Sequence, residues 1–436
     1  MRRHIWMRCS RQYRRRSPDM KLIVDQILRR LIRTGQFDVI WPDGRRSFYG
    51  NRGDGMHAVI HITTHAALRQ IAINPGLAIG ETYMDGTLLP VDCTIYDVLR
   101  VLMSNIGAVE TESLVMRSRA ALRRALRPMT QANDARKARN NVAHHYDLNG
   151  RLYSLFLDRD RQYSCGYFPH GDETIDEAQA AKKRHIAAKL LLDRPGLEVL
   201  DIGCGWGGMA LTLARDYGAL VTGITLSSEQ LDEARNLAVA EGLADRVRFE
   251  LMDYRAMDQR FDRIVSVGMF EHVGVPNYPA FFSTIKRCLR HDGVALLHAI
   301  GRFEPPCGTN PWIAKYIFPG GYSPALSEVF GPLERSGLRS TDVEILRLHY
   351  ARTLARWRRR FDANRDTIAS IYDERFCRMF EFYLAGSQLA FEVQDHMIFQ
   401  LQITRRQDAV PLTRDYMTEC ERAGALTKGF ASQEGD

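Results

Sequence analysis

Short apolar runs alternate with amphipathic stretches in the second half of the chain, and this pattern predicts a parallel, doubly wound α/β sheet. Helical patterns such as SSEQLDEARNLAVAEGL (227–243) separate the runs, as expected when helices cover both faces of a parallel sheet. The strand-like runs are LEVLDIG (197–203), LVTGITL (220–226), VRFELMD (247–253), FDRIVSVG (261–268) and DGVALLHAI (292–300), and later runs near 341–349 and 397–404 would complete the edge. We therefore expect a mostly parallel sheet of seven strands, with the arginine-rich 352–392 segment as a helical cap.

A different pattern precedes this alternation. LIRTGQFDVIWPDGRRSFYGN (31–51) predicts the end of a helix followed by a hairpin, with Pro42, Asp43 and Gly44 in the turn. HAALRQIAINPGLAIGETYMDGTL (65–88) predicts a helix, a Pro-Gly break and a second helix. These elements indicate a small α+β domain without a catalytic constellation of its own.

Composition shifts divide the chain into five predicted segments. SRAALRRALRPMTQANDARKARNN (118–141) is rich in Arg and Ala, so we expect an exposed helix and linker there, either a solvated charged face or one that rests on anionic lipid. The basic N-terminal residues 1–19 either form an arm that touches the membrane or lie ahead of a translation start at Met20. The segments are a basic disordered stub (1–19), the small N-terminal domain (20–107), the basic helix and linker (108–140), the catalytic domain (141–410) and a C-terminal tail (411–436).

Overall composition excludes several classes of protein. Of the 436 residues 45% are hydrophobic and 26% charged, which is typical of a soluble globular enzyme, and no apolar run is long enough to span a membrane. The net charge of +8 suggests anionic surroundings, but no nucleic-acid-binding signature accompanies it. The eight cysteines form no CxxC pair or zinc spacing, which predicts a reducing cytosolic compartment, no disulfide and no metal.

A glycine-rich turn follows the first strand of the predicted sheet, in LEVLDIGCGWGGMALTLARDYG (197–218). Its GxGxxG pattern fits a dinucleotide site, but the second strand ends in Thr225 and Ser227 rather than the acid that such a site needs. The turn D-x-G-x-G-x-G, in which missing side chains allow close approach of the backbone, is typical of S-adenosylmethionine (SAM) methyltransferases. MDY (252–254), after the third strand, fits adenine binding. The alternative is that the glycines serve only a tightly packed turn.

Five further motifs narrow the interpretation. They are HHYDLNGRLYSLFLDRDRQYSCGYF (144–168), GMFEHVG (268–274), LLHAIG (296–301), NPWIAKYIFPGGYSP (310–324) and LHYARTLARWRRRF (348–361). From about Asn141 to Arg405 the chain resembles the cyclopropane-fatty-acyl-phospholipid synthase family, which includes the mycolic acid cyclopropane synthases. NPGLAIGETYMDGTL (74–88) resembles the extra domain of the longer, phospholipid-acting members. The resemblance implies a SAM-methyltransferase sheet and transfer of a methylene to a cis double bond of phospholipid acyl chains through a carbocation.

The resemblance also implies the site residues. A bicarbonate ion would act as base, and Glu271 would accept the proton of its hydroxyl; the residues that hold it map onto Cys165, Glu271, His298, the Ile300 backbone and Tyr350. SAM contacts map onto Tyr163, Ser164, Asp201, Gly203, Cys204, Gly205, Gly207, Thr225, Leu226, Ser227, Gln230, Asp253 and Tyr254. Taken singly, Cys165, His298 and Tyr350 would be interpreted as packing residues, whereas Glu271 follows the fourth strand, where α/β enzymes place ligands.

An aromatic-rich segment precedes the glycine turn, and it predicts either a cation-stabilising tunnel or ordinary core packing. Its members are Tyr153, Phe156, Tyr163, Tyr167 and Phe168. The chain departs from the family at Ser387, in FYLAGSQLAFE (382–392), where many members carry a cysteine. A covalent thiol step at that position is then unnecessary, or the chemistry of this branch is altered.

Three alternatives stay open: a SAM-dependent C-methyltransferase that makes methyl-branched lipids, a small-molecule N-methyltransferase, and a lipid-binding protein without turnover. The expected partners are unsaturated phospholipids and an anionic membrane surface, with a homodimer known in the family and no nucleic acid. Membrane contact is expected through the N-terminal domain and 108–140, with RWRRRF (356–361) as a lesser candidate. These expectations place the protein in the cytoplasm, on the inner face of the cell membrane.

Overall fold

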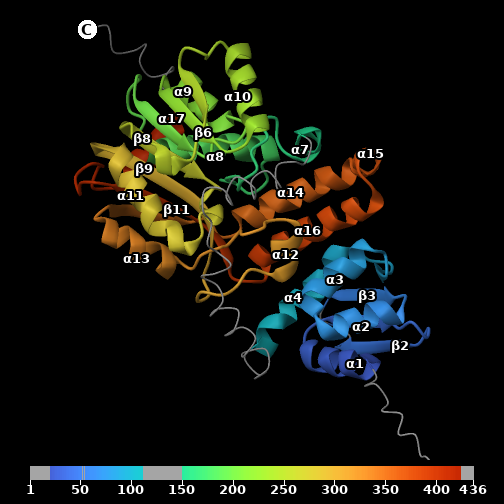
Figure 1. The fold of residues 1–436 in the computed structure, drawn as a ribbon. Coiled ribbons are helices and arrows are strands. Elements are labelled where there is room, and N and C mark those ends of the chain that lie inside the picture. Colours follow the sequence, from blue (N-terminus) through green and yellow to red (C-terminus); the bar gives the residue numbers. More distant parts are fainter. Residues whose placement is uncertain (1–19, 52, 54, 111–149, 424–436) are drawn as a thin grey trace, which may run out of the picture.

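The computed structural model describes residues 20–51, 53, 55–110 and 150–423 (Figure 1). A seven-stranded sheet lies at the centre of its larger domain. In the spatial order given next, the last five strands run parallel to one another, and each of the first two is antiparallel to the strand that follows it. In spatial order the strands are β10 (Arg339–Ile345), β11 (His396–Thr404), β9 (Leu289–Arg302), β8 (Phe261–Val267), β5 (Glu198–Ile202), β6 (Leu220–Thr225) and β7 (Val247–Leu251). The predicted mostly parallel sheet of seven strands is confirmed.

Helices cover both faces of this sheet, because successive side chains of a strand point to opposite sides. Val199 packs into one core with α8, α9 and α10, and its neighbour Leu200 packs into another with α11 and α13. The predicted double winding is thus confirmed. The elements that flank the sheet are α8 (Ile175–Lys189), α9 (Gly208–Tyr217), α10 (Ser228–Ala240), α11 (Tyr278–Cys288), α13 (Leu326–Ser336) and the one-turn helices η1 (Tyr254–Ala256), η2 (Phe270–His272) and η3 (Val275–Asn277).

The strand expected near 341–349 ends earlier than predicted. β10 stops at Ile345, and a helix begins at His349. His349 Nδ1 accepts a hydrogen bond from the backbone N–H of Phe168 at 2.9 Å. The two residues are 181 positions apart in the sequence, so a local pattern could not predict this contact. Tyr350 therefore lies in the first turn of a helix and not in a strand.

A helical cap covers one end of the sheet, as the arginine-rich 352–392 segment predicted. Its members bury a shared cluster of aromatic and aliphatic side chains that includes Phe156, Trp357 and Phe380. The cap helices are α7 (Gly150–Phe156), α12 (Pro311–Tyr316), α14 (His349–Ala363), α15 (Arg365–Ile371) and α16 (Glu374–Glu392).

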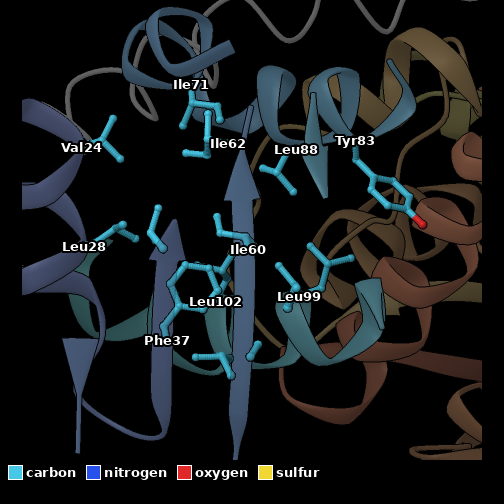
Figure 2. Packing of buried hydrophobic residues seen from close by; sticks show 14 of the residues in the cluster. Val24, Leu28, Phe37, Ile60, Ile62, Ile71, Tyr83, Leu88, Leu99 and Leu102 are labelled. Carbon is cyan, nitrogen blue, oxygen red and sulfur yellow. The ribbon is translucent and has the colours of Figure 1, made fainter. Parts of the chain in front are cut away.

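The N-terminal α+β domain carries a second sheet, in the order β2-β1-β3-β4. The predicted hairpin joins β1 to β2, and its turn closes with Gly44 at a φ of +78°. The predicted break lies at Asn74, which ends α2 and precedes Pro75 at the start of α3. Figure 2 shows the core between the sheet and its helices, with Phe37 and Ile60 near its centre. The elements are α1 (Met20–Leu31), β1 (Gln36–Ile40), β2 (Arg46–Gly50), β3 (His57–Ile62), α2 (His65–Ile73), α3 (Pro75–Met84), β4 (Leu88–Pro90) and α4 (Ile95–Glu110).

Two expected segment boundaries differ from the elements that the structure describes. Helix α4 continues to Glu110, past the boundary placed at 107, and most of the basic segment that follows lies outside the described residues, as does the stub 1–19. The expected C-terminal tail contains α17 (Asp415–Ala423), which packs on α8 and buries Met417. Within the described ranges, no helix is both long and apolar enough to cross a membrane.

The N-terminal domain docks on the cap helices α12 and α16 rather than on the large sheet (Figure 1). Tyr83 donates a hydrogen bond to Glu381 at 2.7 Å, and the Tyr83 side chain points toward the cap in Figure 2. The indole of Trp312, 1% exposed, lies against Gly80 so closely that a Cβ there would stand 2.4 Å from Nε1. The absence of a side chain at Gly80 is therefore what admits Trp312.

We expect Gly80→Ala to destabilise the protein by about 1–3 kcal/mol, because the rigid indole leaves no room for the methyl group. Gly76→Ala in the same helix is the matched control, since its Cβ would meet Pro311 at an ordinary 3.6 Å. The midpoints of urea unfolding compare the two variants. Equal midpoints would show that the Gly80 contact does not limit the docking of the domain.

Candidate active site

A cavity opens at the carboxyl ends of β5, β6, β7 and β8, where parallel α/β sheets bind ligands. Eleven of the expected SAM contacts line it: Tyr163, Ser164, Asp201, Gly203, Cys204, Gly205, Thr225, Leu226, Gln230, Asp253 and Tyr254. Sequence reasoning missed other wall residues, among them Arg161, Gln162, Trp206, Met269 and His272. Arg161 lies over the Trp206 ring at 4.4 Å and forms an ion pair with Glu233, an arrangement that no local motif signals.

The glycine turn after β5 brings bare backbone to the cavity. Gly203 has a φ of +81°, and a Cβ there would clash with Met269 at 2.9 Å. Gly205 has a φ of +56°, and apart from its chain neighbours no described residue has an atom within 4 Å of where a Cβ would stand. Because both conformations favour glycine and Gly205 faces open space, a ligand can approach the backbone closely at this turn.

Gly207 and Ser227, two further expected contacts, lie outside the cavity lining. Gly207 begins α9 with a φ of +88°, and a Cβ there would stand 2.7 Å from the Phe249 ring. Ser227 caps α10, where its hydroxyl accepts the Gln230 N–H at 3.3 Å. In this structure the two residues shape the turns that hold the cavity walls.

Asp201 supplies a negative group that fits a cationic ligand. It is 1% exposed, and its Oδ2 has no hydrogen-bond partner in the described parts of the chain. Burial raises the pKa of this carboxyl to about 7, and the Lys182 ammonium partly opposes that rise. SAM carries an ammonium and a sulfonium, so a buried carboxyl group in this wall suits its positive charge.

Lys182 fixes two neighbouring wall residues and was not foreseen from the sequence. Its Nζ donates to Gln162 Oε1 at 2.6 Å and to Ser164 Oγ at 2.9 Å. On the opposite wall Arg255 holds the Asp253 carboxylate at 2.6 Å. These contacts keep the polar lining in place without a ligand.

A second group of expected residues lies deeper, where β8 and β9 end. Glu271 follows β8 in η2, and its Oε1 accepts the backbone N–H of Ile300 at 2.6 Å. The Glu271 side chain is 8% exposed, and Oε2 has no hydrogen-bond partner among the described residues. Burial raises the pKa of Glu271 to about 7, although the Ile300 hydrogen bond acts in the opposite direction. The Ile300 N–H, which was expected to bind the bicarbonate ion, thus donates a hydrogen bond to Glu271.

His298 lies two residues before Ile300 on β9 and is 1% exposed. Its Nδ1 is 3.1 Å from Gln400 Nε2, while Nε2 has no hydrogen-bond partner within the described ranges. Burial lowers the pKa of His298 well below its ordinary value, and the charges of Lys182 and Lys189 add to this effect. The ring is therefore neutral at physiological pH.

Cys165 and Tyr350 belong to the aromatic cluster of the cap, against which Ile300 also packs. Cys165 is 1% exposed, its Sγ lies 3.2 Å from the carbonyl of Gly166, and burial raises the pKa of its thiol. The Tyr350 ring is 4.9 Å from that of Phe391 and 5.8 Å from that of Trp357. The structure thus places Glu271, His298 and Ile300 at the ends of β8 and β9, and Cys165 and Tyr350 in the cluster that Ile300 contacts. None of them lines the cofactor cavity itself.

Tyr163 joins the cavity to this cluster. It lines the cavity, its ring stacks on Trp357 at 5.2 Å, and its hydroxyl lies 2.7 Å from that of Tyr383. Of the other predicted tunnel residues, Tyr153 and Phe156 share the cluster. Tyr167 packs against the same cluster and also stacks on His349, whereas Phe168 lies beside His349 outside the cluster. Ser387 is half-buried on α16, and no group of residues in the described ranges is placed to hold a metal ion.

The comparisons with known proteins agree with this architecture. A family profile described as "Mycolic acid cyclopropane synthetase" matches residues 133–401, and a domain of unknown function matches residues 23–113. The cyclopropane-fatty-acyl-phospholipid synthase of Escherichia coli K12 is 38% identical over 80% of this chain and 88% of its own. A probable fatty acid methyltransferase of Pseudomonas putida is 41% identical over 61% of this chain and 69% of its own.

A solved structure supports binding of a SAM-type cofactor. Mycolic acid cyclopropane synthase CmaA1, complexed with SAH and CTAB, superposes with a TM-score of 0.57 at 35% identity, over 61% of this chain and 97% of its own. The profile match covers more than half of the chain, and the synthase match covers most of both proteins. The chain therefore belongs to the mycolic acid cyclopropane synthetase family and is a SAM-dependent, lipid-modifying methyltransferase.

Proposed function

We propose that the protein is a cyclopropane-fatty-acyl-phospholipid synthase, which adds a methylene from SAM across the cis double bond of a phospholipid acyl chain. The observation that carries this proposal is the double role of Tyr163, which borders the cavity at the sheet and packs against the apolar, aromatic cluster of the cap. An alkene that takes up a methyl group becomes a carbocation, which water would quench. Aromatic faces stabilise such a cation without attacking it.

The residues around the cluster suit the loss of a proton that closes the ring. When bound, SAM supplies an electrophilic methyl group and bicarbonate supplies a base. His298 Nε2 offers a donor for such an anion, and Glu271 Oε2 offers an acceptor for its hydroxyl. Tyr350 contributes a phenol in the adjoining cluster. Ile300 serves by holding the Glu271 carboxylate in place. The half-buried Ser387 takes no covalent part in this scheme.

The name of the Pseudomonas putida relative favours a second candidate, a C-methyltransferase that makes methyl-branched chains. The same cation would then lose a different proton or be reduced. Loss of a different proton adds one CH₂, as cyclopropanation does, so mass alone does not separate these two products. Reduction would need an external hydride donor and would give a product two hydrogens heavier.

Purified protein incubated with SAM and cis-unsaturated phospholipid vesicles should raise the acyl mass by one CH₂ and give the NMR signals of a cyclopropane ring. Saturated vesicles are the control, because they offer no alkene. A methyl branch in the product would favour the second candidate. SAM binding without any lipid product would contradict both.

Glu271→Gln should lower turnover by about 100-fold or more while stabilising the fold above neutral pH. The folded-state pKa of about 7 exceeds the ordinary 4.5, so the unfolded chain releases this proton first as pH rises. The stability that Glu271 contributes when protonated is therefore lost between about pH 4.5 and pH 7, and this loss amounts to as much as about 3 kcal/mol. Urea unfolding at pH 5 and pH 8 measures the difference.

Glu334→Gln, at an exposed position on α13, is the control for the loss of a charge. We expect it to leave turnover and the pH dependence of stability unchanged. The measured quantity is the free energy of unfolding of Glu271→Gln minus that of the wild type. If this difference is smaller at pH 8 than at pH 5, the result contradicts the buried carboxyl described above.

We also propose that the N-terminal domain docks on the inner face of the cell membrane in the cytoplasm. Its α1 exposes Leu22 (58%) and Ile27 (44%) and ends in Arg29 and Arg30. The lesser candidate, RWRRRF (356–361), has less support, because Arg356 and Arg360 donate hydrogen bonds to backbone carbonyls within the protein. A homodimer stays a prediction.

Leu22→Ser with Ile27→Ser should weaken binding to anionic vesicles by about 10-fold or more, because exposed apolar side chains gain by entering the lipid boundary. Val239→Ser, at an even more exposed apolar position on α10, is the control. Flotation with anionic and neutral vesicles, at low and high salt, measures binding. Binding that ignores salt and lipid charge would contradict the proposed docking.

A further inference from the structure

A chain of buried polar side chains extends from His298 across the antiparallel edge of the sheet. Gln400 pairs with His298 in the register of β11 and β9, and Glu344 pairs with Gln400 in that of β10 and β11. Lys189 of α8 contacts both Gln400, at 2.7 Å from Nζ to Oε1, and Glu344. His185 Nε2 lies 2.7 Å from the Glu344 carboxylate. Three neighbouring strands thus place side chains in one row that ends at His298.

The contacts of Gln400 fix the orientation of its amide. Lys189 donates to Oε1, and an ammonium has no lone pair to accept with, so the amide cannot rotate without losing this bond. Nε2, which only donates, therefore faces His298 Nδ1 at 3.1 Å. Nδ1 must accept, and the proton of the neutral ring is then on Nε2.

The charges around the ring agree with a neutral imidazole. Lys182, Lys189 and His185 disfavour a further positive charge on His298, and Glu344 opposes them only in part. Burial would raise the pKa of Glu344, but the hydrogen bond from His185 and the charge of Lys189 lower it to about 2. Glu344 is therefore a carboxylate at neutral pH and keeps Lys189 beside Gln400.

We propose that Gln400 and Lys189 are positioning residues that hold His298 as the Nε2–H tautomer. The ring then presents a hydrogen-bond donor at Nε2, the atom without a partner in the described part of the chain. This inference rests on the proposed function, in which a small anion receives that bond. Without Gln400, a neutral histidine is free to place its proton on Nδ1 and to turn an acceptor toward the anion.

Stability alone does not account for this row of polar residues. Gln400 and Lys189 are 0% and 1% exposed, and removal of a lysine and an amide from water is costly. Well-packed apolar side chains at such positions are often as stabilising or more so. The polar row is therefore better explained by what it does for His298.

The test uses Gln400→Glu, which replaces the amide donor by an acceptor of the same size. The ¹⁵N NMR spectrum of protein labelled at histidine reports the tautomer, and His298→Gln identifies the signal among the thirteen histidines. We expect protonated Nε2 in the wild type and protonated Nδ1 in the variant. Turnover should fall by about 10- to 100-fold, the range for groups that orient a site residue, while the Kd for SAM stays within about twofold.

Gln402→Glu is the matched control. Gln402 lies two residues further on the same face of β11, is 1% exposed, and donates to the Lys189 carbonyl and the Tyr416 hydroxyl at 2.6 Å each. We expect this variant to keep the wild-type tautomer and turnover. If Gln400→Glu does not fold, the pair Gln400→Met and Gln402→Met replaces it, with a mixture of tautomers expected only in the former.

Three results would overturn the inference: wild-type His298 protonated on Nδ1, an unchanged tautomer in the Gln400 variants, or a changed tautomer with unchanged turnover. Failure of the proposed function is a separate result. It would appear as wild-type protein that makes no lipid product, and the spectra would still decide which ring nitrogen carries the proton.

Discussion

The hydrogen bond from the Ile300 N–H to Glu271 joins the ends of two neighbouring parallel strands, and the proposed chemistry of the site depends on it. At 2.6 Å it fixes one carboxylate oxygen and leaves the other buried. A buried carboxylate that receives only backbone hydrogen bonds from the described residues is poorly compensated for the water that it has lost, which is why its pKa rises to about 7. A carboxyl group near neutrality exchanges protons readily at physiological pH.

The two sides of the site come from different parts of the fold. The sheet contributes polar atoms, since Glu271, His298 and Gln400 lie at or beside the ends of β8, β9 and β11. The cap contributes apolar and aromatic surface from α14 and α16. The two sides meet at Ile300, which lies on β9 and packs against the cluster that contains Tyr350 of the cap.

Local patterns in the sequence were sufficient for the fold and for the glycine turn, because apolar runs, helix signals and D-x-G-x-G each lie within a few residues. These local patterns did not show whether a residue binds the ligand or caps a helix. Gly207 and Ser227 are residue types that serve both roles, and here they begin helices. Lys189 and Gln400 were missed because they meet from positions 211 residues apart. The one local signal was a pair of glutamines at inward positions of the otherwise apolar strand MIFQLQI (397–403).

Helix α16 connects the N-terminal domain to the site. Ala385 and Leu389 pack into the core of that domain, whereas Phe380 and Tyr383 face the aromatic cluster on the other side of the helix. Tyr383 in turn lies 2.7 Å from the hydroxyl of Tyr163 at the cofactor cavity. Since cores are close-packed, a movement of the domain against α16 must also shift the wall beside Tyr163. The N-terminal domain is therefore packed, through α16, against residues that reach the wall of the cavity.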